Sequence, residues 1–392
     1  MRFRLAALLP FLGAVLISGD GFSVTFTPLP IFPDDDRESY ASGISADGST
    51  IVGYLAKGTD RYALQAVKWT VDGGIEALPS SHGVKFESAR AVSGDGSVIV
   101  GQGFDGETRA VRWTAQTGTV LLEDDSLGQR PLAGYGVSDD GAAIVGLHRA
   151  AGPRHGFIWR NGRTEQLPLP TPDERGTAYS VTSDGSIVVG EMWHGSPMGG
   201  EAFRWSEVDG VVGLGWLPDR DGNSCATDVS SDGTIIVGYS LNSDSAVTEA
   251  FRWTEDAGLV GLGHLPGGFG QYSAASAVSA DGSRIVGADG QSNLGDYKDR
   301  QAFLWDSQHG LRSISDLLNE TGVDLSGWEL NGAADISADG TRIVGWGVNP
   351  LGVDQAWLVD LSLVPEPTSG TLVALGLTAA AAHRRKRSDA RR

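Results

Sequence analysis

The residues with the clearest chemical potential are seven aspartates, each followed directly by glycine. They are Asp47, Asp95, Asp140, Asp184, Asp232, Asp281 and Asp339. An isolated aspartate of this kind could bind a metal ion or take part in catalysis. An Asp-Gly pair between two apolar, β-branched runs is instead typical of a hairpin turn, because glycine reaches positive φ without steric cost. Seven copies in one chain favour the turn, since an enzyme seldom repeats its chemistry seven times.

Other catalytic and metal-binding signatures are missing from the sequence. The histidines form no HxH, HExxH or HxxxH pair, so a zinc enzyme has no support. No G-x-S-x-G elbow, phosphate-binding loop or CxxC pair occurs either. The segment DRDGNS at 219–224 loosely resembles the first half of a calcium loop, but its twelfth position is Ser230 instead of an acid. We therefore expect a polar turn there and no cofactor, with Ca²⁺ as the alternative ligand.

The overall charge argues against nucleic acid as a partner. The 392-residue chain carries a formal net charge of −19, and no basic patch interrupts its acidic body. Its single cysteine, Cys225, rules out an intramolecular disulfide. Cys225 lies in SCATDVS, a segment of small residues for which we predict an innermost strand and an inert, buried thiol.

The first 21 residues have the pattern of a secretory signal peptide. Arg2 and Arg4 precede the apolar run LAALLPFLGAVLIS, which ends in the small-x-small site GDG. A structural strand or core helix is the alternative interpretation. We predict a signal peptide at 1–21, followed by a domain at 22–363 that works outside the cytoplasmic membrane.

The C-terminal segment combines a Pro-Glu-Pro triplet, about fifteen small and apolar residues, and a basic cluster. The apolar run is shorter than the ~20 residues of a comfortable transmembrane helix, and the basic cluster fits the cytoplasmic side of a membrane. Segment 364–388 resembles the PEP-CTERM sorting signal of Gram-negative bacteria that make exopolysaccharide. The resemblance implies a short membrane helix and an exosortase-type sorting enzyme that cleaves near the triplet; a plain C-terminal anchor is the alternative. The residues that carry it are Pro365, Glu366, Pro367, Arg384, Arg385, Lys386 and Arg387.

Seven repeats organise the body of the chain. The Asp-Gly aspartates are 44 to 58 residues apart, and a glycine always stands six residues after each of them. A second shared segment, such as AFRWT at 250–254, comes next, and a fourth apolar run such as LVGLGHLP follows a turn. No helical period persists in the body, so four short strands per repeat are predicted. The tryptophans of the second shared segment are Trp69, Trp113, Trp159, Trp205, Trp253 and Trp305.

Four strands in about 45 residues are typical of a β-propeller blade. The first strands are rich in Ala, Gly and Ser, which fits an axis with little room for bulky side chains, while Trp and Phe of the third strands would fill the space between sheets. The last repeat lacks its fourth strand, and VTFTPLP at 24–30 matches VGLGWLP at 212–218. The sequence predicts an all-β, seven-bladed β-propeller of four-stranded antiparallel blades, closed by an N-terminal strand in the last blade and followed by the short C-terminal membrane helix. A solenoid with capped ends is the alternative.

Over about residues 40–361 the repeats resemble the extracellular HAF repeat family, named for a His-Ala-Phe tripeptide before the Trp-containing strand. The matching tripeptides here are Glu-Ala-Phe at 201–203 and 249–251, Gln-Ala-Phe at 301–303 and His-Gly-Phe at 155–157. The naming histidine survives only as His155, with glycine in place of the alanine. The resemblance implies an exported propeller-like protein and no particular activity.

Candidate binding residues come from the variable connections after the second and fourth strands, because binding residues tend to sit on variable loops held by a rigid scaffold. Tryptophan and tyrosine can stack on sugar rings, and carboxylates can hold Ca²⁺. Packing beneath the long loops is the alternative role for each of them. The candidates are Trp193, His194, Trp216, Asp219, Asp221, Tyr272, Tyr297, Asp299 and Trp328.

These observations predict a non-catalytic binding or adhesion scaffold. It would be exported and retained at the cell surface, or released into the extracellular matrix, of a Gram-negative-type bacterium. Polysaccharide or envelope proteins are the expected partners. The alternative is a secreted polysaccharide-active hydrolase or lyase, because catalytic residues can assemble from distant blades. A pair of partly buried carboxylates facing each other across the central channel would favour that alternative.

Overall fold

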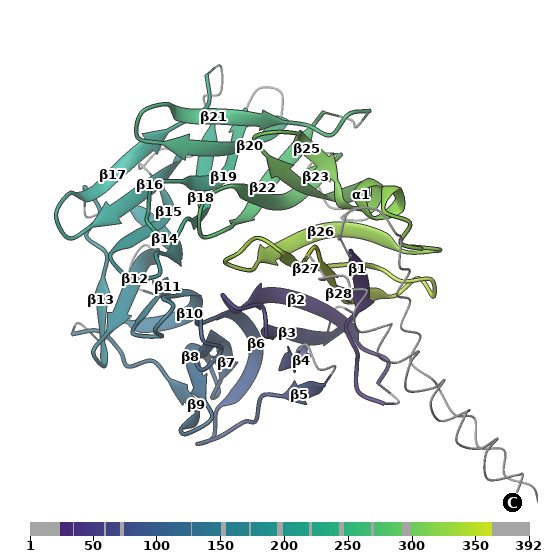
Figure 1. Cartoon of the computed structure of the whole chain (residues 1–392). Helices are drawn as coiled ribbons and strands as arrows, with labels where there is room; N and C mark the ends of the chain where they lie inside the picture. The colour runs from purple at the N-terminus through teal and green to yellow at the C-terminus, as the bar shows by residue number, and fades with distance from the viewer. Residues whose placement is uncertain are drawn as a thin grey trace, which may run out of the picture.

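The computed structural model describes twelve segments of the chain, and it is built almost entirely from β-strands (Figure 1). The described segments are 24–33, 35–58, 60–70, 74–126, 128–149, 154–171, 174–193, 199–218, 222–242, 247–267, 270–291 and 299–362. The predicted signal peptide and sorting signal lie outside them. The prediction of an all-β body is confirmed.

Consecutive strands form antiparallel groups of four, each of which we call a unit. The first three units contain β2 (Glu38–Ile44), β3 (Thr50–Lys57), β4 (Asp60–Thr70) and β5 (Ile75–Ala77); β6 (Lys85–Val92), β7 (Ile99–Phe104), β8 (Thr108–Thr114) and β9 (Gly118–Leu121); and β10 (Arg130–Val137), β11 (Ala143–Arg149), β12 (Arg154–Arg160) and β13 (Arg163–Gln166). Each of these units is a separate four-stranded sheet.

The next twelve strands form one continuous sheet. They are β14 (Arg175–Val181), β15 (Ile187–Trp193), β16 (Gly200–Ser206), β17 (Gly210–Gly215), β18 (Asn223–Val229), β19 (Ile236–Asn242), β20 (Val247–Thr254), β21 (Gly258–Gly263), β22 (Tyr272–Val278), β23 (Arg284–Gly290), β24 (Arg300–Asp306) and β25 (Gly310–Ser313). Single parallel positions, Gly200 with Asn223 and Thr248 with Tyr272, join its three antiparallel units. The sheet is therefore three units that touch at two points.

The last unit joins the two ends of the described chain. It contains β26 (Glu329–Ile336), β27 (Arg342–Val348), β28 (Asp354–Asp360) and, as its outer strand, β1 (Thr25–Pro28). Phe26 pairs with Val359, and the Leu29 amide donates to the Ala356 carbonyl at 2.9 Å. The predicted pairing of an N-terminal strand with the last repeat is confirmed.

The Asp-Gly segments are the turns between the first two strands of each unit. In the first unit the Ser45 hydroxyl and the Ser49 amide both donate to the Asp47 carboxylate, at 2.6 and 2.9 Å. Gly48 has a φ of 69°, which glycine adopts without strain. The hydroxyl and amide lower the pKa of Asp47. The turn interpretation is confirmed, and the aspartate serves as a turn cap.

Hydrogen bonds link these turns into a closed circle. Each turn contacts the next through the residue that precedes its Asp-Gly aspartate. In six of the seven contacts, the backbone amide of this residue donates to the backbone carbonyl of the equivalent residue in the next turn. In the seventh contact, the Ser183 hydroxyl donates to the Ser231 hydroxyl at 2.8 Å. The final amide, that of Ala338, returns to the Ala46 carbonyl at 3.1 Å. In order, the circle is Ala46, Gly94, Asp139, Ser183, Ser231, Ala280 and Ala338.

The core lies between units rather than within one layer. Among the described residues, seven apolar clusters each combine side chains from two neighbouring units. One of them packs Ile51 and Val67 of the first unit against Val344 and Leu358 of the last. Burial of this kind contributes about 1.5–3 kcal/mol per large apolar side chain. Packing therefore closes the same circle as the hydrogen bonds.

The third-strand aromatics fill these clusters unevenly. The phenylalanines are fully buried, whereas Trp159, Trp253 and Trp305 are only partly so. Trp69 is fully buried and its indole N–H donates to the Pro30 carbonyl at 2.7 Å. The expectation that Trp and Phe of the third strands fill the space between sheets is therefore confirmed, with Trp159, Trp253 and Trp305 packed against these clusters while partly exposed.

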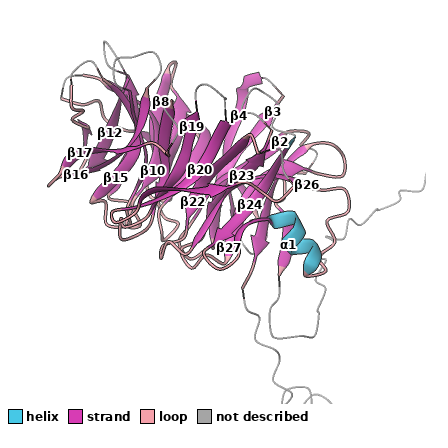
Figure 2. Cartoon of the chain, turned by 90° about the horizontal axis from the view of Figure 1, so that it is seen from above, coloured by secondary structure: helices cyan, strands magenta, loops and turns pink. Residues whose placement is uncertain are grey.

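One short helix interrupts the strands. Helix α1 (Ile314–Glu320) begins after Ser313, whose hydroxyl accepts from the Asp316 amide, and it buries Ile314 and Leu318. The sequence analysis did not predict it. Within the described residues no helix combines the length and apolar character needed to span a bilayer. Viewed from the side in Figure 2, the strands run between two faces that carry the connecting loops.

Candidate binding site in the central channel

The first strands of the units surround the centre of the molecule (Figure 1). A cavity of about 210 Å³ lies among them beside the Asp-Gly turns, and all seven first strands contribute to its lining. A wider cavity of about 680 Å³ lies toward the opposite strand ends, which lead to the variable loops. Arg90, Tyr135 and Tyr179 line both cavities. The two cavities are the narrow and wide halves of one channel.

Aromatic side chains from five of the seven units line the wide half, and we call them the aromatic collar. Tyr40 stacks on Tyr54 with ring centroids 5.2 Å apart and lies 6.1 Å from Trp346. Tyr135 and Tyr179 form a second pair at 5.6 Å. Such rings offer flat apolar faces with polar tips to a ligand. The collar consists of Tyr40, Tyr54, Tyr135, Tyr179, Tyr272 and Trp346.

Two arginines and an aspartate stand among these rings. The Arg90 guanidinium lies 5.9 Å from the Tyr54 ring centroid, and that of Arg300 lies 4.0 Å from Tyr272. Both distances fall within the range of cation–π attraction. The Tyr40 hydroxyl donates to Asp354 at 2.7 Å. Burial and the neighbouring Asp354 raise the pKa of Tyr40, so this hydroxyl stays protonated.

No salt bridge engages Arg90 in the part of the chain that the structure describes. Its Nε atom is buried without a hydrogen-bond partner there. Arg37, Arg109 and Arg342, by contrast, each contact a carboxylate within 3.0 Å. A half-buried guanidinium without a carboxylate partner can pair with a ligand anion.

Two carboxyl groups line the narrow half. Asp228 accepts hydrogen bonds from the Ser180 hydroxyl at 2.6 Å and from the Val278 amide at 2.8 Å. Asp335 accepts from the Ile44 amide at 2.8 Å. Burial raises the pKa of Asp228 to about 6. Burial and the nearby Asp228 charge raise the pKa of Asp335 to about 7. Both groups therefore tie neighbouring units together and bind protons near neutral pH.

The predicted binding residues are scattered. Of the nine, only Tyr272 lines the channel among the described positions. Trp193 and Trp216 are 36% and 39% exposed at the loop ends of their strands. Trp328 meets Phe26 edge to face at 5.1 Å and so packs beside the closing strand. His194, Asp219, Asp221 and Tyr297 lie outside the described residues. Their binding roles stay predictions.

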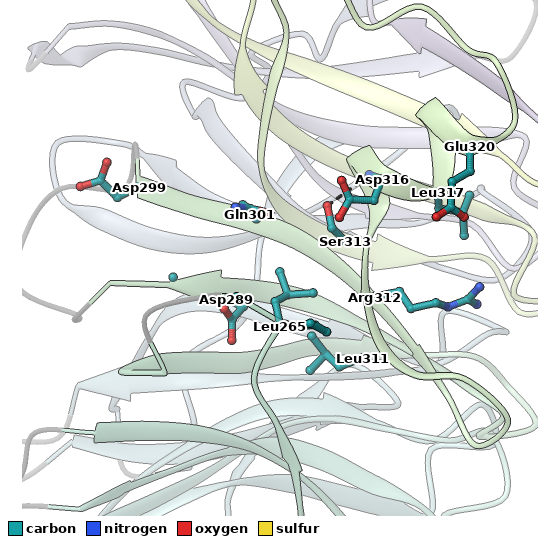
Figure 3. A pocket seen from close by; sticks show the side chains of 13 residues that line it. Leu265, Asp289, Asp299, Gln301, Leu311, Arg312, Ser313, Asp316, Leu317 and Glu320 are labelled. Atoms are coloured by element: carbon teal, nitrogen blue, oxygen red, sulfur yellow. Dashed lines mark hydrogen bonds between the residues drawn. The ribbon is translucent and has the colours of Figure 1, made fainter.

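Asp299 lines a separate cavity of about 380 Å³ beside α1 and β25 (Figure 3). Asp289, Asp316 and Glu320 make this cavity acidic, and Asp289 pairs with His264 at 3.0 Å. Across the described residues, no group of three or more His, Cys, Asp or Glu side chains is arranged to hold a metal ion. The described residues therefore offer no candidate Ca²⁺ site, and binding of Ca²⁺ stays a prediction.

The sequence pattern did not indicate the channel residues. The small residues of the first strands predicted little room for bulky side chains at the axis, and this is wrong at Arg90, Tyr135 and Tyr179, which line an open channel. The signal was present as single large residues inside small-residue strands, SARAVS, AGYGVS and TAYSVT. Cys225 meets its expectation, since its thiol is buried in β18 and burial raises its pKa.

Comparison with known proteins supports the fold alone. No family model matches the chain, and no curated protein does. An oligogalacturonate lyase from Vibrio parahaemolyticus is 13% identical, with a TM-score of 0.53 over 90% of this chain and 96% of that one. A puromycin hydrolase variant is 13% identical with a TM-score of 0.54 over 83% of this chain, which spans 52% of the hydrolase. The β-propeller domain of the Trilobed protease from Pyrococcus furiosus, also 13% identical, has a TM-score of 0.49 over 84% of this chain and 99% of the domain. The chain has an all-β fold whose structural neighbours are β-propeller proteins.

Proposed function

We propose that this protein is an exported seven-bladed β-propeller that binds a glycan, without catalysis, in the wide half of its central channel. The observation that carries the proposal is the aromatic collar, six aromatic side chains gathered from five of the seven repeats around one cavity of about 680 Å³. Aromatic rings with polar tips suit the faces and hydroxyl groups of sugars. A cavity of this size lies in the range of small-molecule sites.

The count of seven blades is supported by three independent features. Each Asp-Gly repeat begins one four-stranded unit, the twelve-stranded sheet divides into three units at two single parallel positions, and β1 supplies the fourth strand of the last unit. The closed circle of hydrogen bonds and the seven clusters between units fit a ring. A capped solenoid would leave the contact between the last and first units unexplained.

Export and sorting are proposed from the sequence. The signal-peptide pattern at 1–21 and the resemblance to a PEP-CTERM signal at 364–388 support a route to the cell surface or extracellular matrix, with an exosortase-type enzyme as partner. The resemblance to HAF repeats supports the same location. Replacing the Pro-Glu-Pro triplet by alanine should leave the protein in the membrane fraction of its host, which immunoblotting of fractions would measure.

A polysaccharide-active hydrolase or lyase is the second candidate. Asp228 and Asp335 line the channel with raised pKa values, as an acid–base pair would require. One structural neighbour is, by name, an oligogalacturonate lyase. Binding remains our first proposal because both carboxylates are already engaged by amides of the next unit.

Calorimetric titration of the purified protein with a panel of defined oligosaccharides tests the proposal, with chromatography of each mixture to detect products. Tyr54→Ala should weaken binding about tenfold, equivalent to about 1.4 kcal/mol. Trp216→Ala is the matched control, because this residue is 39% exposed and is not among the residues that line either half of the channel. Binding without products would support the scaffold; products lost in Asp228→Asn would support the second candidate. Equal effects of the two aromatic substitutions would overturn the location in the channel.

A further inference from the structure

We infer that the ligand is an acidic sugar whose chain end enters the channel and places its anionic group on Arg90. This inference rests on the proposed glycan-binding function and specifies the class of ligand. It follows from three properties of the channel: an arginine without an anionic partner, its position where the channel narrows, and the negative groups beyond it.

Arg90 stands at the junction of the two halves. It comes from β6 and lines both the wide and the narrow cavity, with its guanidinium over the Tyr54 ring at 5.9 Å. A ligand that rests on the collar would therefore meet this group at its inner end. The planar guanidinium can donate two parallel hydrogen bonds to a carboxylate or a sulfate.

The charge of Arg90 needs a partner that the described residues do not supply. No salt bridge engages Arg90 there, and its Nε is buried without a hydrogen-bond acceptor. The whole chain has a formal net charge of −19, so surplus carboxylates are abundant elsewhere. Arg90 is half-buried, so its charge is only partly solvated. A ligand anion would pair with this charge and would bind here in preference to a neutral sugar.

A second cation faces the same cavity at its outer end. Arg300, at the start of β24, lies over Tyr272 at 4.0 Å. The one carboxylate of the wide half, Asp354, accepts a hydrogen bond from Tyr40. The lining of the wide half thus includes two arginines and one aspartate.

The narrow half would stop the ligand at Arg90. Its volume falls from about 680 to about 210 Å³, and the carboxyl groups of Asp228 and Asp335 line it. Above the raised pKa values of these two carboxyl groups, an anionic group would be repelled from this region by like charge. A polysaccharide would therefore bind by its end, and its interior units would remain outside the channel.

Calorimetric titration with trigalacturonic acid, its fully methyl-esterified form and a sulfated neutral trisaccharide tests the inference on the intact protein. The acid should bind at least tenfold more tightly than the ester. Arg90→Gln should bring the ratio of acid to ester affinity close to one, whatever its effect on ester binding, and Arg90→Lys should restore part of the preference. Arg163→Gln, at an exposed arginine on β13, is the matched control. Tight binding of the sulfated probe would identify sulfate as an equivalent anion and would also support the inference.

Binding by the chain end can be tested separately, through the stoichiometry of binding to a polymer. For a polygalacturonate of known length, the number of protein molecules bound should follow the number of chains rather than the number of sugar units. Saturation in proportion to total sugar would overturn the end-entry part. Equal affinities for acid and ester, unchanged in both Arg90 variants, would overturn the inference while leaving glycan binding intact. If neither the acidic nor the neutral probes bind, both this inference and the proposed glycan-binding function are overturned. Circular dichroism of each variant separates loss of binding from loss of folding.

Discussion

At the scale of single residues, the glycine six positions after each Asp-Gly aspartate has a steric cause. An added Cβ at Gly190 would overlap the Thr177 carbonyl oxygen and press on the Phe203 ring at 2.9 Å. Because both neighbours are fixed in the sheet, Gly190→Ala should lower the free energy of unfolding by about 2–3 kcal/mol. Gly199→Ala is the control, since nothing lies within 4 Å of its added Cβ. Urea denaturation measures both, and equal small losses would contradict the steric explanation.

Asp335 is expected to destabilise the protein at alkaline pH. Its pKa rises from 3.8 to about 7 on folding, so the folded state holds a proton that the unfolded chain has already lost. Stability from this group therefore increases as pH falls from about 7 toward 4. Asp335→Asn keeps an oxygen for the Ile44 amide without the charge. It should raise the free energy of unfolding by about 1–4 kcal/mol at pH 8 and by little at pH 4.5. Urea denaturation at both values is the test; a loss at each would sink the prediction.

The channel residues could not be found by counting along the first strands. A strand normally sends alternate side chains to opposite faces. In this protein every first strand changes register in its middle, as between Ala178 and Ser180 or Gly134 and Gly136. Such a bulge moves later side chains to the other face. The small residues were visible in the sequence, but which large ones faced the axis depended on this register.

At the scale of elements, the stability that an Asp-Gly turn gives to the fold should depend on pH. Asp232 accepts hydrogen bonds from the Thr234 amide and the Ser230 hydroxyl, which lower its pKa. This group stabilises the fold above its unfolded pKa and loses that effect as pH falls below it. Asp232→Ala should cost about 1 kcal/mol at pH 7 and less below pH 4. Asp256→Ala, in an exposed turn, serves as control. A pH-independent loss from thermal melts would show that the carboxylate charge plays no part.

The repeated elements could be predicted and the single ones could not. Turns, strand number and the pairing of β1 with β28 were accessible because each left a recurring residue pattern, such as the shared V-x-[LF]-x-x-L-P run. Helix α1 occurs once, spans seven residues and buries only Ile314 and Leu318. So short a segment has too few turns for a helical period to appear in the sequence.

At the scale of the whole molecule, closure makes the first and last units interdependent. The hydrogen bond from Ala338 to Ala46 joins positions 292 residues apart, and the pairs between β1 and β28 join positions more than 320 residues apart. The cluster between these units joins the same two ends of the chain. Closing so long a loop costs entropy, but the cost grows only slowly with length. A closed ring also leaves fewer exposed strand edges than an open array. Stability should therefore be shared around the ring instead of belonging to separate repeats.

Leu29 is the point at which this dependence can be tested. It follows β1, is 4% exposed, and packs between the first and last units while its amide bonds Ala356. Leu29→Ala should lower the free energy of unfolding by about 2–4 kcal/mol, because a cavity would open at the closure. Hydrogen exchange should quicken in β28 and in β3 together, although they lie at opposite ends of the sequence. Val208→Ala, at a side chain 93% exposed, should change neither. Faster exchange confined to β28 would mean that the last unit opens alone and that the ring is not a cooperative whole.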